Sequence, residues 1–231
     1  MTTPNIKLMS NAWDKLSGKW GTAIAGFLVY FLTIIIISII PKIGNFITLI
    51  VGGPFAFGVA AFFLRLARDQ ESDINLIFSG FRNKFSQSLS AYLMVLVYVF
   101  PWTLLCVLPG TISYVLHVEY WGYIAFAGIP FIIPAIIVSL NYSQVYYILS
   151  DNDTLPTMDL LRKSKAMMFG HRLKYIGIGL LFGLFIILSA ATLFIGLIWL
   201  LPWMQLTLAF FYEDIREKEE GEIITATEEE I

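Results

Sequence analysis

The sequence predicts an all-α polytopic membrane protein, with six transmembrane helices arranged as three hairpins and a cytoplasmic amphipathic interfacial helix before each hairpin. Two observations predict this fold class. Of the 231 residues, 58% are hydrophobic and only 14% are charged, whereas an average soluble domain is about half apolar and about a quarter charged. The apolar residues are also concentrated in runs of about twenty residues without Asp, Glu, Lys or Arg, the length that crosses a bilayer.

The order of the elements follows from these runs. Thr3-Pro4 begins a first amphipathic helix, because proline is favoured at the start of a helix. Its apolar stripe consists of Ile6, Met9, Trp13, Leu16 and Trp20. The six spans are expected at about residues 20–40, 46–66, 89–115, 121–149, 175–191 and 196–212, within a single membrane domain over residues 1–212.

Two further amphipathic helices are expected between the spans. Ser72 or Asp73 caps the second helix, whose apolar positions 74, 77, 78, 81 and 85 keep the i, i+3, i+4 spacing. Pro156 begins the third helix, in which apolar residues form one stripe and the charged residues lie elsewhere. That stripe consists of Leu160, Leu161, Met167 and Met168.

After the last span, residues 213–231 are polar and acidic. This tail contains nine acidic residues, and its only cations are Arg216 and Lys218. A run of this charge is usually solvated. We therefore expect a disordered cytoplasmic tail.

The lysine and arginine residues predict the orientation of the chain. If both termini lie on one side of six spans, fourteen of the fifteen Lys and Arg residues collect on that side, and only Lys42 lies on the other. Basic loops mark the cytoplasmic face of a membrane. The sequence therefore predicts a multi-pass protein with both termini in the cytoplasm, whereas five or seven spans would scatter the cations.

The three junctions between an amphipathic helix and its hairpin have similar sequences. Each contains a glycine followed by cations and an aromatic residue: GKW at 18–20, GFRNKF at 80–85 and GHRLKY at 170–175. Glycine lets a surface helix bend toward the membrane, cations reach the headgroups, and an aromatic ring lies at the boundary. One interpretation is a parallel threefold repeat. The other is that any hairpin entering a bilayer from a charged face has this composition.

Several segments resemble one known family. The most specific blocks are Tyr-Tyr-Ile-Leu-Ser-Asp-Asn at 146–152 and Phe-Tyr-Glu-Asp at 211–214, and LLCVLPG at 104–110 adds to them. From about Lys15 to Asp214, the chain resembles the bacterial integral membrane family catalogued as domain of unknown function 975. The resemblance implies a helical membrane fold and a location in the bacterial cell (inner) membrane. Because that family has no assigned activity, it implies no catalytic residues.

The sequence contains no recognisable catalytic or metal-binding constellation. No Asp, Glu, Lys, Arg or His falls near the middle of a predicted span, which argues against a proton-coupled pump. His117 and His171 are expected on opposite faces of the membrane and cannot share a metal ion, and the single cysteine, Cys106, is expected to be a packing residue. We expect no enzymatic activity and no cofactor. Cations spread along a membrane face beside an acidic tail also argue against nucleic-acid binding.

A polar cluster near the inner end of the fourth span is the main candidate site. Asn141 and Gln144 are three residues apart and share one face of a helix, and Gln205 in the sixth span could face them. These amides either form hydrogen bonds between helices, because an amide facing lipid is costly, or line a cavity for a solute.

The cytoplasmic cations are candidate contacts for anionic lipid headgroups, each worth about 1 kcal/mol near the surface. They are Lys19, Arg82, Lys84, Arg162, Lys163, Lys165, Arg172 and Lys174. The sequence thus favours a non-enzymatic membrane component that interacts with lipids, with other membrane proteins or with a second copy of itself, and that supports envelope or transport functions. The alternative is a transporter or channel for an apolar or uncharged solute, with the three amides of the polar cluster along its path.

Overall fold

The computed structural model describes residues 3–41, 43–117, 124, 126–152 and 154–229, and these residues form helices and the turns between them. The order along the chain is α1 (Asn5–Leu16), α2 (Trp20–Ser38), α3 (Gly44–Ala67), η1 (Ile74–Phe78), α4 (Ser79–Arg82), α5 (Phe85–Val115), η2 (Phe126–Phe131), α7 (Ile132–Asn141), α8 (Val145–Asp151), α9 (Thr157–Met167), α10 (Arg172–Ser189), η3 (Ala190–Thr192) and α11 (Leu197–Glu229). The all-helical class predicted from the sequence is confirmed for this part of the chain.

Helix α3 lies at the centre of the fold. Of its most apolar stretch 61% is buried, against 17% for α2 and 6% for α5. Helices α2, α5, α8 and α11 all pack on α3, and its side chains Phe62 and Phe63 are fully buried. Because lipid tails are as apolar as leucine, helices in a membrane associate through close packing and polar contacts. Close packing on α3 therefore positions the other helices.

Five helical stretches of the described chain are long and apolar enough to cross a membrane. They are Trp20–Ser38, Phe46–Ala67, Phe85–Val115, Phe126–Asp151 and Arg172–Thr192, and they overlap the first five predicted spans. The sixth predicted span, 196–212, is the first half of α11, where Gln205 and Thr207 lower the hydropathy and Glu213 follows. A sixth crossing therefore stays a prediction. Lys42, the cation expected on the outer side, lies outside the described residues.

The second predicted amphipathic helix is a short 3₁₀ helix, η1, followed by the single turn α4. The side chain of Asp73 caps η1 by accepting a hydrogen bond from the Asn75 backbone N–H (3.2 Å). Of the two predicted caps, Ser72 and Asp73, it is therefore Asp73 that caps the helix. Ile77 is fully buried. A continuous amphipathic α-helix was expected over these residues. The chain instead forms these two short helices in succession, and both pack against α3.

Glycines allow this close packing. A Cβ atom on Gly58 of α3 would lie 1.9 Å from the Ile77 carbonyl oxygen, and one on Gly80 would lie 2.2 Å from the Pro54 carbonyl oxygen. Real Cβ atoms do not approach backbone oxygens so closely. The η1–α4 segment therefore lies directly against the backbone of α3.

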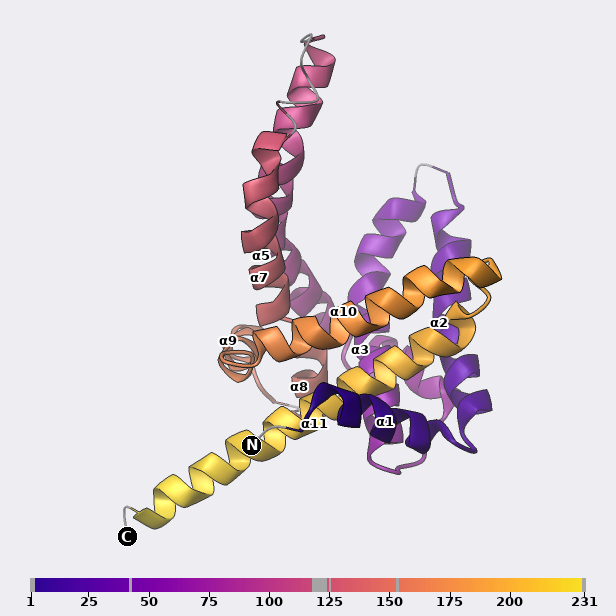
Figure 1. Cartoon of the computed structure of the whole chain (residues 1–231), viewed down its shortest axis with the longest axis vertical. Coiled ribbons are helices and arrows are strands. Elements are labelled where there is room, and N and C mark those ends of the chain that lie inside the picture. Colours follow the sequence, from indigo (N-terminus) through magenta and orange to yellow (C-terminus); the bar gives the residue numbers. More distant parts are fainter. Residues whose placement is uncertain (1–2, 42, 118–123, 125, 153, 230–231) are drawn as a thin grey trace.

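Helices α5 and α7 run side by side and extend away from the rest of the molecule, with η2 packed on α5 (Figure 1). Close approach again depends on glycine, since a Cβ atom on Gly128 of η2 would lie 1.9 Å from the carbonyl oxygen of Cys106 on α5. Cys106 itself is half-buried. Its backbone thus lies at a helix contact, and its side chain lines the pocket described below.

The apolar stripe predicted for α9 is buried in the structure. Leu160 and Met168 are fully buried, and Leu161 and Met167 are 3% and 5% exposed. Helix α9 packs on α5, α7, α8 and α11. Its apolar face therefore contacts other helices of the same chain.

The buried face of helix α1 overlaps the predicted stripe only in part, at Met9 and Leu16. Leu8, Met9, Ala12 and Leu16 are buried, whereas Ile6 is 75% exposed and Trp13 is 48% exposed. The apolar arc of this helix is wider than the stripe: one half packs on α11, where the Trp203 indole N–H donates to the Met9 carbonyl oxygen (2.9 Å). The other half remains at the surface, as in helices that lie in a membrane interface.

The three predicted junctions differ in backbone conformation. Gly18 follows α1 with a φ of 79°, and Gly170 follows α9 with a φ of 81°. Both lie in the left-handed region that favours glycine. Gly80 lies within α4 and has no positive φ. The first and third junctions therefore share a left-handed glycine that the middle junction lacks. In this feature the three junctions do not form a uniform threefold repeat.

The acidic tail differs from the disordered segment that was expected. Helix α11 continues without interruption from Leu197 to Glu229, and Figure 1 shows its end extending away from the other helices. Glu213 forms an ion pair with Arg68, directly after α3, and Asp214 forms one with Lys174 of α10, so both fix the start of the tail. The Glu and Lys residues that follow are also good helix formers. The boundary predicted at residue 212 therefore lies inside a helix.

Candidate functional site

The fourth apolar stretch is interrupted by a break in the helix. Helix α7 ends at Asn141 and α8 begins at Val145, so residues 142–144 form a turn between them. The backbone hydrogen bonds across this turn are long, at 3.3 Å for Tyr142 N to Ser139 O and for Ser143 N to Leu140 O. Non-helical backbone within a membrane is tolerated where protein covers it or where it lines a cavity, and both conditions hold here.

Ser164 of α9 covers one side of this break. Its hydroxyl donates to the Asn141 carbonyl oxygen (2.7 Å) and accepts from the Gln144 backbone N–H (3.3 Å). Ser164 is fully buried. Helix α9 thus replaces hydrogen bonds that the broken helix has lost.

The structure brings together two of the three amides predicted as a polar patch. Asn141 is 7% exposed and Gln144 is fully buried, and the Gln144 side-chain N–H donates to the Ser143 hydroxyl (2.8 Å). The side-chain oxygens of both amides have no hydrogen-bond partner within the described chain. Gln205 of α11 lines a pocket whose lining includes neither Asn141 nor Gln144. Asn141 and Gln144 therefore belong to the helix break, and neither lines a cavity described here.

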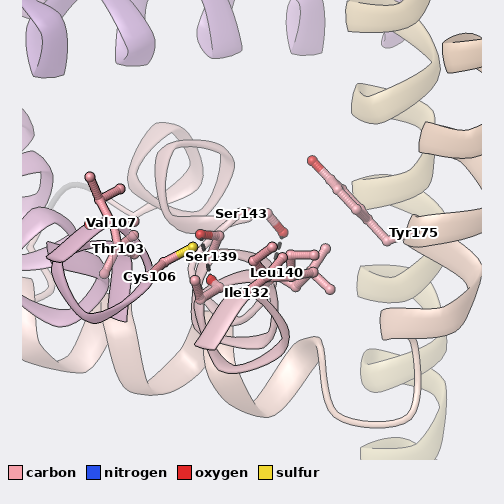
Figure 2. Close-up of a pocket in the computed structure, with 11 residues that line it drawn as sticks. Thr103, Cys106, Val107, Ile132, Ser139, Leu140, Ser143 and Tyr175 are labelled. Carbon is pink, nitrogen blue, oxygen red and sulfur yellow. Dashed lines mark hydrogen bonds between the residues drawn. The ribbon is translucent and has the colours of Figure 1, made fainter. Parts of the chain in front are cut away.

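An apolar pocket of about 480 Å³ lies beside the break, between α5, α7 and α10. Its lining consists of Val99, Thr103, Cys106, Val107, Ile132, Ala135, Ile136, Ser139, Leu140, Ser143 and Tyr175. Figure 2 shows Tyr175 reaching across from α10 toward Ser143. Because Thr103, Val107 and Ile136 are exposed at the surface of two apolar stretches, the opening of this pocket would face hydrocarbon in a bilayer.

The hydroxyl groups of this pocket can act toward a ligand mainly as hydrogen-bond acceptors, because their protons already form hydrogen bonds within the protein. The hydroxyls of Thr103, Ser139 and Ser143 each donate to a carbonyl oxygen of the preceding turn, at 2.9 Å in every case. The oxygen of Ser143 already accepts a hydrogen bond from Gln144, whereas the lone pairs of Thr103 and Ser139 leave these two hydroxyls able to accept further hydrogen bonds. The pocket therefore suits an apolar molecule whose polar end carries hydroxyl or amine donors.

A second, smaller pocket of about 250 Å³ lies on the other side of Ser143 and Tyr175, which line both pockets. Tyr30, Tyr146, Tyr147 and Gln205 supply its polar groups, and Ala56, Val59, Ala60 and Leu208 complete the lining. We call it the tyrosine pocket. No carboxylate or cation is among its described lining residues, so its polarity comes from uncharged hydroxyl and amide groups.

An ion-pair network joins the C-terminal ends of α3 and α8 to the middle of α11. Arg68 donates two hydrogen bonds to the Asp151 carboxylate (2.7 and 2.8 Å) and two to one carboxylate oxygen of Glu213 (2.9 and 2.6 Å). The Tyr212 hydroxyl donates to Asp151 (2.9 Å), and Arg216 donates to Glu213 (2.8 Å). Hydrogen bonding to Asp151 raises the pKa of Arg68 further above its ordinary value. The network therefore holds three segments that are distant in sequence.

A second polar cluster fixes the N-terminal segment. The Thr3 backbone N–H donates to Asp214 (2.9 Å), Lys174 forms an ion pair with Asp214, and the Asn5 side chain donates to the Lys174 carbonyl oxygen (3.0 Å). Burial raises the pKa of Asp214, but the hydrogen bonds from Lys174 and Thr3 outweigh it, so this pKa lies below its ordinary value. The carboxylate is thus charged near neutral pH and holds α1 and α10 to α11.

Sequence analysis did not identify these clusters. One signal was present: the two blocks at 146–152 and 211–214 that carry the family resemblance each contain an acidic residue, Asp151 and Glu213, and both bind Arg68 in the structure. Arg68 also lies directly after an apolar stretch. What the sequence lacks is the pairing, because Arg68 and Glu213 are 145 residues apart.

The cations predicted to contact anionic lipid lie in different surroundings. Lys19 pairs with Asp69, Lys174 with Asp214 and Arg162 with Asp159. Arg82 and Lys165 are exposed, and Lys84, Lys163 and Arg172 are half-buried. Lys19, Lys174 and Arg162 thus have carboxylate partners within the described part of the chain.

Comparison with known proteins identifies one family. A family model described as "Protein of unknown function (DUF975)" matches residues 1–219, a range that covers every helix of the structure up to the middle of α11. No curated protein and no solved structure matches the chain. Within the described residues, no group of three or more His, Cys, Asp or Glu side chains could hold a metal ion.

Proposed function

We propose that this chain, which belongs to the DUF975 family of proteins of unknown function, is a non-enzymatic membrane component that binds a lipid or a similar uncharged amphiphile beside the break in its fourth apolar stretch. The observation that carries the proposal is the pocket of about 480 Å³ between α5, α7 and α10, with its hydroxyl groups near the helix break. Ligand pockets commonly measure about 300–1,000 Å³ and are mostly apolar with a few polar groups.

The lining chemistry supports a ligand with one apolar and one polar end. Val99, Val107 and Ile136 would contact an acyl chain, while the lone pairs of Thr103 and Ser139 would accept hydrogen bonds from its polar end. In a bilayer the apolar contacts alone confer little preference, because the surrounding lipid is equally apolar. The hydroxyl groups would therefore supply the selectivity.

The same proposal includes a location in the bacterial inner membrane, with six spans and both termini in the cytoplasm. Five apolar stretches of sufficient length and the concentration of cations on one side support it. Lipids are then the expected partners, and other membrane proteins or a second copy of the chain could cover the apolar faces of α5 that the single chain leaves exposed.

Filling the pocket tests the proposal. Ala135 lines it, so Ala135→Trp is expected to lower the fraction of molecules that carry a lipid about tenfold, which corresponds to about 1.4 kcal/mol. Native mass spectrometry of the detergent-solubilised full chain measures that fraction.

Ile133→Trp is the matched control. Ile133 lies on the same helix, is 64% exposed and does not line the pocket, so this variant should keep its lipid. Equal lipid occupancy in both variants and in the unchanged protein would overturn the proposal.

A transporter or channel for an apolar or uncharged solute is the second candidate. The observation that favours it is the pair of adjoining pockets, which share Ser143 and Tyr175 and together approach Gln205. A path would require these two residues to move apart. The tyrosine pocket would then receive the solute from the apolar pocket, and its uncharged lining would suit an uncharged solute.

Cysteine accessibility distinguishes the two candidates. In a Cys106→Ala background, Gln205→Cys should react with a membrane-impermeant thiol reagent if the tyrosine pocket opens to water during transport, and should resist it if the protein only binds lipid. Asn75→Cys, at an exposed position, is the reactive control. Ile187→Cys, 72% exposed on an apolar stretch, is the unreactive one.

A further inference from the structure

A polar pocket of about 530 Å³ lies at the start of α5, between α3, the η1–α4 segment and α8. Its polar lining consists of Arg65, Ser79, Asn83, Lys84, Gln87 and Ser150. The pocket shares no residue with the apolar pocket or with the tyrosine pocket. It is therefore a separate candidate binding site, and its chemistry is different.

Hydrogen-bond donors dominate this lining. Arg65 offers a planar fork of five N–H groups that matches phosphate oxygens, and Lys84 places a second positive charge in the lining. The amides of Asn83 and Gln87 and the hydroxyls of the two serines add neutral donors. A ligand rich in acceptor oxygens and negative in charge fits these groups best.

Two further observations point to a missing acceptor. The Ser79 hydroxyl is buried and has no hydrogen-bond partner within the described chain. Arg65 forms no ion pair with a described residue, whereas Arg68, three positions later, is held by both Asp151 and Glu213.

Helix α5 contributes a positive end at the same place. The helix has 31 residues, and no side chain caps its N-terminus. The N-cap residue Lys84 makes no side-chain hydrogen bond to the first N–H groups, and these groups lie beside Lys84 and Gln87, which line the pocket. The free N–H groups of a helix N-terminus favour phosphate and other anions.

The depth of the pocket matches a lipid headgroup. Arg65 lies near the end of the apolar stretch Phe46–Ala67, where long cationic side chains reach the membrane boundary. Phe57 and Leu76 supply an apolar part of the lining. A phosphate at the level of Arg65 would thus leave the apolar portion of a lipid beside these two side chains.

We propose that this pocket binds a phosphate group, carried either by an anionic phospholipid of the adjacent leaflet or by a soluble phosphorylated compound. Arg65 contacts the phosphate oxygens, and Ser79 and the first turn of α5 complete the contact. The site does not depend on the function proposed for the apolar pocket, because the two have no residue in common.

The test compares Arg65→Gln with Arg82→Gln. Arg82 is an exposed cation two residues before Lys84 and does not line the pocket. Binding of dioleoyl-phosphatidylglycerol to the full chain in a non-ionic detergent is measured by native mass spectrometry, with phosphatidylcholine as the neutral lipid. Arg65→Gln is expected to weaken phosphatidylglycerol binding about tenfold, as for a lost charge-assisted hydrogen bond, while Arg82→Gln changes it less than about twofold.

A second arm identifies the source of the phosphate. Inorganic phosphate is titrated against the lipid-free protein while its thermal unfolding is followed. Stabilisation that disappears in Arg65→Gln would indicate a soluble ligand, and binding of phosphatidylglycerol alone would indicate a lipid; either result supports the site. Arg65→Lys, which keeps the charge but not the fork, should retain part of the binding and shows that the variants fold.

Equal losses in Arg65→Gln and Arg82→Gln would mean that only the diffuse surface charge attracts the lipid, and would overturn the site. No loss in Arg65→Gln would overturn it as well. Because Ala135→Trp leaves this pocket unchanged, a failure of the lipid proposal for the apolar pocket would be seen separately.

Discussion

Replacing Arg68 by methionine is expected to destabilise the folded protein by about 3–5 kcal/mol, the cost of breaking a buried ion pair from one side. The side chains of Asp151 and Glu213 are only 15% and 14% exposed, so without Arg68 two carboxylates would stay in a partly desolvated site. Tyr212 and Arg216 would remain as partners, which limits the loss. Reversible unfolding in mixed detergent and SDS measures it.

Arg162→Met is the matched control for this change. Arg162 pairs with Asp159 on the exposed side of α9, and its side chain is 76% exposed. Exposed ion pairs contribute about 0–1 kcal/mol, so this variant should unfold nearly as the unchanged protein does. If Arg68→Met costs no more than Arg162→Met, the network does not hold α3, α8 and α11 together.

Gly58→Ala is expected to have a similarly large effect, at or above the upper end of the ~1–3 kcal/mol usual for overpacking. The added methyl group would lie 1.9 Å from the Ile77 carbonyl oxygen and 2.5 Å from its carbon. Backbone atoms cannot turn aside as a flexible side chain can, so η1 must separate from α3. Loss of that contact should appear as a lower thermal midpoint of the detergent-solubilised protein.

Gly183→Ala shows whether the effect is specific to this position. Gly183 lies in α10, and no atom lies within 4 Å of its would-be Cβ atom. Alanine favours a helix over glycine by about 1 kcal/mol, so this variant should be as stable as the unchanged protein or slightly more stable. Comparable destabilisation by Gly58→Ala and Gly183→Ala would contradict the close packing of η1 on α3.

Much of the fold could be predicted because the bilayer imposes simple lengths and periods. Apolar runs of about twenty residues give five stretches that the structure also contains as helices. The stripe of α9 and the cap at Asp73 follow equally from local rules, since helical periodicity and capping involve residues only a few positions apart. These features need no knowledge of the rest of the chain.

The candidate sites could not be predicted in the same way. The break at 142–144 has no proline or glycine in the sequence, and its hydrogen bonds come from Ser164, twenty residues away. The polar patch was expected to include Gln205, but Gln205 lines a pocket that Asn141 and Gln144 do not line. The position of a residue along α11 does not tell which other helix its side chain faces. The phosphate pocket combines residues of α3, α4, α5 and α8, a combination that only the packing of these helices creates.

The sequence by itself predicted the helical class and the positions of the apolar stretches that could cross a membrane, because hydropathy and length act locally against a uniform solvent. The side on which the cations collect stays a prediction. The tertiary structure alone decided that α3 is central, that η1 and α4 pack against its glycines, and that Arg68 meets Asp151 and Glu213. The physical reason is that lipid surrounds every helix with the same apolar medium. The arrangement of the helices therefore depends on close steric fit and on a few long-range polar contacts, which no local pattern contains.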